Sequence, residues 1–293
     1  MSEANDYTRN RLGRFRSIKM RRPAVAGSFY ASERQGLVKQ IESCYLHKLG
    51  PGNLPKGKEK GARKIKGAVV PHAGYMYSGP VAAWVYSALA EDGFPECFVI
   101  IGPNHTGYGS GIALTKEPFS TPLGTASIDE PFADALLDTI IDNDFNAHKH
   151  EHSIEVQLPF LQYIREDITF VPLCMGIQDY QTAKDVGNAI KNAVSKTKRD
   201  IVVIASSDFT HYERRAEAER KDKIAIREIL NLNSKALYEA VERYSITMCG
   251  YGPVMAMLES ITGTKGVLLK YATSGDIEKE MAEVVGYAGI IIE

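Results

Sequence analysis

The stretch Lys66-Gly67-Ala68-Val69-Val70-Pro71-His72-Ala73-Gly74-Tyr75 has the form of a buried β-strand that ends abruptly at a histidine. Two later stretches repeat this form: Phe98-Val99-Ile100-Ile101-Gly102-Pro103-Asn104-His105 and Ile201-Val202-Val203-Ile204-Ala205-Ser206-Ser207-Asp208-Phe209-Thr210-His211. Continuous β-branched runs are typical of strands that are covered on both faces, as in parallel sheets. Because ligands of open α/β sheets bind outside the carboxyl ends of the strands, we expect the three histidines to share one site.

The order of the expected elements predicts the fold class. Strand patterns alternate with helical patterns along the chain, and the helical spacing of apolar residues is clear over 79–89, 180–195 and 234–244. This alternation predicts a single three-layer α/β/α domain around a mainly parallel or mixed sheet. We expect residues 21–293 to form this domain and the polar, basic residues 1–20 to be a flexible extension.

Composition excludes several classes of partner. The net charge is −1, from 35 Lys and Arg against 36 Asp and Glu, so no overall field attracts nucleic acid or an anionic membrane. No apolar run approaches the roughly 20 residues that span a bilayer. The four cysteines are widely spaced, which suits a reduced cytosolic protein better than a disulfide framework. We therefore expect a soluble, cytoplasmic protein that binds neither nucleic acid nor membrane.

Histidines and one carboxylate are the candidate functional groups. His72, His105 and His211 follow the three strands, His152 ends a His-rich run, and Asp208 precedes His211. A single histidine after a strand is more often structural, but the shared position at strand ends favours function. Imidazole suits zinc, copper, iron and nickel, so converging histidines predict a transition-metal site. Asp208 is either a ligand or a carboxylate that holds a histidine in one tautomer.

Cys249 is a further candidate, for which two alternatives stay open. It precedes a Gly-rich turn and an expected helix, and a helix N-terminus favours the thiolate over the thiol. Gly250, Gly252 and Pro253 favour a specific, exposed turn. The alternative is a buried, inert cysteine, which is what we expect of the other three cysteines.

The combination of motifs resembles the Memo family, whose animal members are named as mediators of cell motility, and within it the prokaryotic branch. The match runs in family order from Ala26 to the last expected strand, and so covers nearly everything after residue 20. Its motifs are Pro71-His72-Ala73-Gly74-Tyr75, Gly102-Pro103-Asn104-His105, Glu151-His152-Ser153-Ile154-Glu155, Ser207-Asp208-Phe209-Thr210-His211-Tyr212 and Cys249-Gly250.

The resemblance implies a fold similar to the class III extradiol (LigB-like) dioxygenases, with the site at the strand ends. It also implies that His72, His105 and Cys249 bind the metal. The dioxygenases hold ferrous iron with two histidines and a carboxylate, whereas here a cysteine takes the place of the carboxylate. A two-His-one-Cys set is softer and also suits copper or zinc, so dioxygenase activity is not assured by the shared fold.

The same resemblance puts Asp208 and His211 beside the metal ligands and His152 close to them. We expect His211 to act as general acid or base, and Asp208 to orient it or to complete the coordination shell. His152 is the third candidate catalytic residue.

The resemblance also bears on ligands and partners. Phe29 stands where animal members carry a tryptophan in the pocket wall, and Tyr75 and Tyr212 are further candidates for that wall. A small molecule or a peptide is the expected ligand of the cleft. In the prokaryotic branch, a Memo domain often stands alongside radical-SAM and AMMECR-type proteins, which implies a functional link to them.

Three hypotheses of function follow. The first is a metal-dependent oxidoreductase that uses iron or copper and is related to the non-haem dioxygenases. The second is a non-catalytic module that binds a peptide or small ligand in the same cleft. The third is a zinc hydrolase that uses a metal-activated water.

Overall fold

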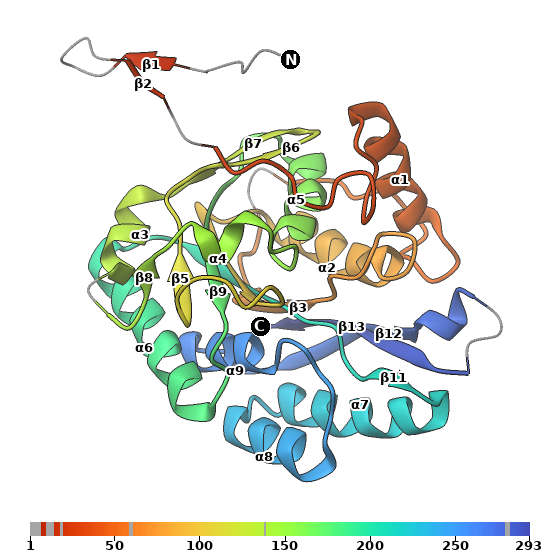
Figure 1. Ribbon diagram of the computed structural model, residues 1–293. Coiled ribbons are helices and arrows are strands. Elements are labelled where there is room, and N and C mark those ends of the chain that lie inside the picture. Colours follow the sequence, from red (N-terminus) through yellow and green to blue (C-terminus); the bar gives the residue numbers. More distant parts are fainter. Residues whose placement is uncertain (1–6, 10–14, 18–19, 59–60, 138, 279–281) are drawn as a thin grey trace.

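The computed structural model describes residues 7–9, 15–17, 20–58, 61–137, 139–278 and 282–293. Its centre is a set of four neighbouring parallel strands (Figure 1). They are, in spatial order, β3 (Gly67–Val70), β10 (Ile201–Ser206), β4 (Cys97–Pro103) and β9 (Thr169–Met175). Because these strands are parallel, their carboxyl ends meet at one edge of the sheet, which is where the predicted site residues follow.

Shorter and antiparallel strands complete the sheet on both sides. Next to β3 lies β13 (Val284–Ile292), which pairs antiparallel with β3, β12 (Gly266–Thr273) and β11 (His211–Glu213). Next to β9 lie β5 (Ile112–Leu114), which pairs on its other side with β8 (Asp142–Asn143), and β7 (Gly124–Ile128), which also pairs with β6 (Phe119–Thr121). The sheet is therefore mixed and parallel at its centre, which confirms the predicted α/β class.

Helices cover both faces of the sheet. Alternate residues of β3 enter different cores: Val69 packs on one face, and Ala68 and Val70 pack on the other. The first face is covered by α3 (Glu130–Leu137), α6 (Tyr180–Thr197), α7 (Arg215–Leu230), α8 (Ser234–Tyr244) and α9 (Tyr251–Ser260). The second is covered by α1 (Arg34–Leu46), α2 (Gly79–Asp92), α4 (Asn146–Lys149), and α5 (Leu158–Ile164) with the 3-10 turn Glu155–Gln157 before it. This is the predicted three-layer arrangement (Figure 1).

Within residues 1–20, the structure describes a short antiparallel pair of strands, β1 (Tyr7–Arg9) and β2 (Phe15–Ser17). Most of this segment lies outside the described residues, so the flexible extension stays a prediction. Among the described helices, none combines the length and the apolar character that crossing a membrane requires.

Candidate metal centre

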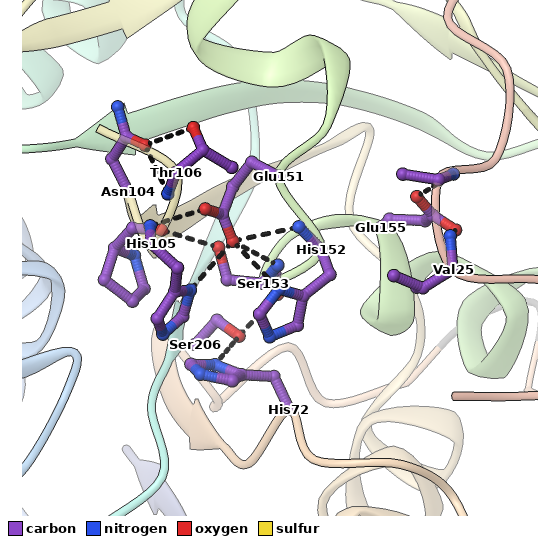
Figure 2. A network of polar contacts seen from close by, with 12 residues as sticks. Val25, His72, Asn104, His105, Thr106, Glu151, His152, Ser153, Glu155 and Ser206 are labelled. Atoms are coloured by element: carbon purple, nitrogen blue, oxygen red, sulfur yellow. Dashed lines mark hydrogen bonds and ion pairs between the residues drawn. The ribbon is translucent and has the colours of Figure 1, made fainter. Parts of the chain in front are cut away.

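Three histidines from three loops converge at the carboxyl edge of the sheet. His72 follows β3, His105 follows β4, and His152 lies in the loop before α5 (Figure 2). One ligand atom of each lies within 4.8 Å of those of the other two. The centroid of the His72 ring is 5.1 Å from that of His105 and 5.5 Å from that of His152. The His105 and His152 rings stack with their centroids 4.6 Å apart. The convergence predicted from parallel strand ends therefore holds for His72 and His105, and His152 joins them.

The buried carboxylate of Glu151 fixes the imidazole of His105 and the backbone of His152. Its Oε1 accepts hydrogen bonds from the backbone N–H groups of His152 and Ser153, each at 2.9 Å, and its Oε2 accepts from His105 N–H at 2.5 Å. The Nδ1 atoms of His105 and His152 lie 2.9 and 3.4 Å from Oε1. A carboxylate only accepts, so Nδ1 of His105 carries the proton and its Nε2 keeps a free lone pair.

Ser206, the last residue of β10, fixes the third imidazole. Its hydroxyl lies 2.6 Å from the Ser153 carbonyl oxygen, which only accepts, so its single proton points there. Ser206 Oγ then accepts from the Gln157 amide at 2.8 Å and from His72 Nδ1 at 2.9 Å. Gln157 itself is oriented, because its oxygen accepts from the Tyr86 hydroxyl at 2.6 Å. His72 is therefore the Nδ1–H tautomer, with the Nε2 lone pair toward the site.

Burial keeps the imidazoles of His72 and His152 neutral. It lowers the pKa of His152 to about 4, against the opposing effect of Glu151, and lowers the pKa of His72 well below its usual value. Burial alone would raise the pKa of Glu151, but the hydrogen bond and charge of His105, together with His152 and the Ser153 N–H, lower it to about 2. The site thus pairs one firmly ionised carboxylate with neutral ligand groups.

Cys249 lies next to His72. Its Sγ is 3.2 Å from His72 Nε2 and accepts the Asp208 N–H at 3.3 Å. Since His72 Nε2 is an acceptor, the thiol proton lies between sulfur and nitrogen. Burial and the Asp208 carboxylate raise the pKa of this thiol, which is the opposite of the shift that a helix N-terminus favours. Gly250 permits this packing, since a Cβ there would lie 2.4 Å from the Ser206 carbonyl oxygen.

Asp208 and His211 lie beside the histidines, in the segment after β10. Asp208 Oδ1 accepts the backbone N–H of His72 at 2.8 Å, and burial raises the pKa of this carboxyl to about 6. Asp208 thus holds the His72 backbone and makes no hydrogen bond to an imidazole Nδ1. His211 Nδ1 lies 2.8 Å from the Thr247 carbonyl oxygen, so Nδ1 carries the proton and Nε2 is free to accept one.

A cavity of about 500 Å³ opens beside this group. Its lining includes His105, His152, Asp208 and His211, and the predicted wall residues Phe29 and Tyr212. The Phe29 ring lies 4.7 Å from the His152 ring.

The prediction that Tyr75 lines the pocket wall is wrong, because Tyr75 lies in the core and is not among the residues that line this cavity. Its hydroxyl donates to the Val156 carbonyl oxygen at 2.6 Å, and its ring packs on Tyr30 and Phe160. Tyr75 pairs an apolar ring with one polar atom, so a backbone carbonyl in the core suffices to satisfy it.

Two other histidines of the run 148–152 stay apart from the site. His148 is buried in the core, where its Nε2 lies 3.2 Å from the Ala113 carbonyl oxygen, and His150 is exposed. Glu151, Ser206 and Gln157 are functional residues that the sequence analysis missed. Only Glu151 left a signal, since it stands directly before His152 in the sequence.

Comparisons with known proteins agree with the resemblance drawn from the motifs. The family model described as Memo-like protein matches residues 21–291. A MEMO1 family protein of Methanopyrus kandleri is 50% identical over 278 residues, which cover 92% of this chain and 98% of the relative. MEMO1 family proteins of Methanocaldococcus jannaschii and Methanosarcina acetivorans are 48% and 46% identical, each over 94% of this chain and 99% and 100% of their own lengths.

Among solved structures, the uncharacterized protein JW3007 of Escherichia coli K12 is similar with a TM-score of 0.45 and 13% identity, over 78% of this chain and 99% of that one. The extent of the family match and the identity to relatives of the same length show that the chain belongs to the Memo family.

Proposed function

We propose that the protein is a metal-dependent redox protein that holds iron or copper with His72 and His105. The observation that carries this proposal is the set of converging imidazoles in which the Nδ1 atoms of His72 and His105 face hydrogen-bond acceptors, so that their Nε2 atoms are the ones available to a cation. Imidazole donors with an adjacent thiol fit iron, copper and zinc, and do not fit calcium or magnesium, which take oxygen ligands. A bound iron or copper ion would supply one-electron exchange with dioxygen or an organic substrate.

The third ligand is either Cys249 or His152. Cys249 lies within 3.2 Å of His72 Nε2, and His152 has a ligand atom within 4.8 Å of those of both other histidines. We favour Cys249, because its S–H group points at the Nε2 lone pair of His72. A metal bound to that lone pair would take the place of the thiol proton and would lie next to the sulfur. His152 then lines the cavity beside the ligands.

His211 is the proposed general base. Its Nδ1–H is held by the Thr247 carbonyl, and the opposite nitrogen is free to accept a proton from a substrate in the cavity. Asp208 holds the backbone of His72 and so positions that ligand. The four cysteines are all free thiols, which supports the cytoplasmic location predicted from their spacing.

Metal analysis after anaerobic purification tests this proposal. We expect about one equivalent of iron or copper per chain in the wild type, and loss of it in His72→Ala and Cys249→Ser. His150→Ala is the matched control, because His150 is exposed and outside the three-His group. A wild type that takes up no stoichiometric metal after loading contradicts the proposal. Tight zinc binding without iron or copper binding favours the zinc hydrolase instead.

The cavity favours one alternative, a module that binds a peptide or small ligand. Its volume of about 500 Å³ and its wall of Phe29, Tyr77, Tyr212 and Tyr287 offer more apolar surface than a metal ion needs. Metal-stripped protein that binds its ligand as tightly as the metal-loaded form would establish this alternative.

A further inference from the structure

A buried ion pair joins two segments behind the metal centre. The N-terminal strap, residues 20–30, carries Arg21, and the site loop, residues 148–155, carries Glu155. Both side chains are fully buried, and Arg21 Nη1 donates to Glu155 Oε2. Charged side chains are almost never fully buried without a partner, so this pair is a specific feature of the fold.

Arg21 also holds the backbone of the site loop. Its Nε donates to the His148 carbonyl oxygen at 3.0 Å, and its Nη2 donates to the Glu151 carbonyl oxygen. One planar guanidinium therefore holds the backbone at both ends of the segment 148–151, which ends at Glu151. This use depends on the fork of donors that arginine has and lysine lacks.

Glu155 in turn holds the strap. Its carboxylate accepts the backbone N–H of Val25 at 3.1 Å (Figure 2), that of Ala24 at 2.7 Å, and also the Tyr30 hydroxyl. The strap ends on the site itself, because the Phe29 ring lies 4.7 Å from the ring of His152. His152 is thus contacted by the strap on one side and held by Glu151 on the other.

Stability alone does not account for this arrangement. Replacing a buried ion pair with apolar side chains of similar volume is often neutral or stabilising, because desolvation of the two charges offsets their attraction. Apolar side chains, however, cannot fix the carbonyl groups of His148 and Glu151. The contact that only arginine supplies is the one to the loop that carries the site.

We propose that Arg21, with Glu155, is a positioning residue of the metal centre: it fixes the site loop so that Glu151 holds the imidazole of His105 and the backbone of His152. This inference rests on the proposed function, since it assigns these residues to the same site. His72 is held less directly, because it contacts Ser206 of β10, and only the Ser206 hydroxyl, through its bond to the Ser153 carbonyl oxygen, reaches the site loop. The ion pair should therefore act most strongly on His105 and His152 and less on His72.

Arg21→Lys tests the proposal, because lysine keeps the charge opposite Glu155 but cannot reach both carbonyl groups. We expect the dissociation constant for Co²⁺ to rise about 10- to 100-fold, which is typical when a residue that orients metal ligands is changed. The matched control is Arg199→Lys, since Arg199 pairs with the buried Asp129 at 2.9 Å, where β7 meets the start of β9. An equal loss of affinity in both variants would overturn the proposal, as would an unchanged affinity in Arg21→Lys.

Imidazole ¹⁵N NMR of the metal-free protein supplies a readout that a merely structural role would not move. In Arg21→Lys, the resonances of His105 and His152 should change tautomer or broaden, while those of His72 change less. Changes at His72 as large as those at His105 and His152, or no change at any ring, would contradict the inference. Wild type that binds no Co²⁺ would refute the proposed function, and the NMR pattern would still test the positioning.

If Arg21→Lys does not fold, the double variant Arg21→Gln/Glu155→Gln takes its place. It leaves no unpaired buried charge, and its shorter amide cannot span the two carbonyl groups. The same selective change at His105 and His152 is expected, and its absence in a folded double variant overturns the inference.

Discussion

Metal binding to the wild type should release about one proton more than metal binding to Cys249→Ser. At pH 7 the thiol of Cys249 is protonated, because burial and the Asp208 carboxylate raise its pKa. A cysteine ligand binds as the thiolate, so coordination by Cys249 must expel that proton. His72 and His152 have lowered pKa values and are neutral at this pH, so neither has to lose a proton before its Nε2 binds a metal. The difference between the two proteins therefore reports on sulfur alone.

Calorimetric titration of the metal-free protein with Zn²⁺ measures this difference. The observed heat is plotted against the ionisation enthalpy of several buffers at pH 7, and the slope gives the number of protons released. With Cys249 as ligand, the wild-type dissociation constant should also fall about tenfold for each unit rise in pH below the thiol pKa. His150→Ala should match the wild type in slope and affinity.

Equal slopes for the wild type and Cys249→Ser would refute thiolate ligation. The ligands would then be His72, His105 and His152, the three that converge within 4.8 Å, and His152→Ala should abolish binding. Zn²⁺ is chosen as the probe because it has no redox chemistry that could oxidise the thiol during the titration.

Three further predictions concern the surroundings of the site. Glu151→Gln should weaken Zn²⁺ binding about 10- to 100-fold by calorimetry. The reason is that an amide cannot accept hydrogen bonds from all the N–H groups that the Glu151 carboxylate holds. An unchanged affinity would contradict the role of Glu151 in holding the histidines. Burial lowers the pKa of His148 to about 4, so the folded state resists its protonation, and the stability that this histidine contributes above pH 6.5 is lost as pH falls toward 4. In urea unfolding, the loss of stability over this range should be about 3 kcal/mol larger for the wild type than for His148→Gln. Gly250→Ala should cost about 1–3 kcal/mol in the same assay, because the new Cβ would lie 2.4 Å from the Ser206 carbonyl oxygen, and an unchanged midpoint would disprove the close packing.

The position of the site could be predicted from the sequence because it depends on strand type. Continuous β-branched runs indicate strands buried on both faces, and in a parallel sheet the loops after them share one edge. His72 and His105 follow such runs directly, so their convergence needs only that β3 and β4 lie near each other. In the structure a single strand, β10, separates them.

The groups that hold the histidines could not be predicted, because they depend on contacts between distant segments. Glu151 fixes His105 only because the site loop returns to the end of β4, a separation of 46 residues. Arg21 lies at the end of a basic segment, where solvent exposure is the usual expectation. Its full burial follows from the strap crossing behind the site loop, which no local pattern encodes. Tyr75 shows the opposite error, because it was predicted to line the pocket and lies in the core. An aromatic residue near a site histidine is equally well placed to pack in the core.

The hydrogen bonds of the site favour the binding of a cation. Neutral imidazoles each carry one proton, and here the Nδ1 atoms of His72 and His105 direct it away from the centre, to Ser206 and Glu151. The Nε2 lone pairs then face the centre, and among the described side chains only the Cys249 thiol lies within donor distance of one of them. Converging lone pairs without donors repel each other and lose hydrogen bonds, which a fold tolerates where a ligand compensates. A cation satisfies all of them at once, and a neutral ligand needs a donor for each, which is why metal binding is the first property to measure.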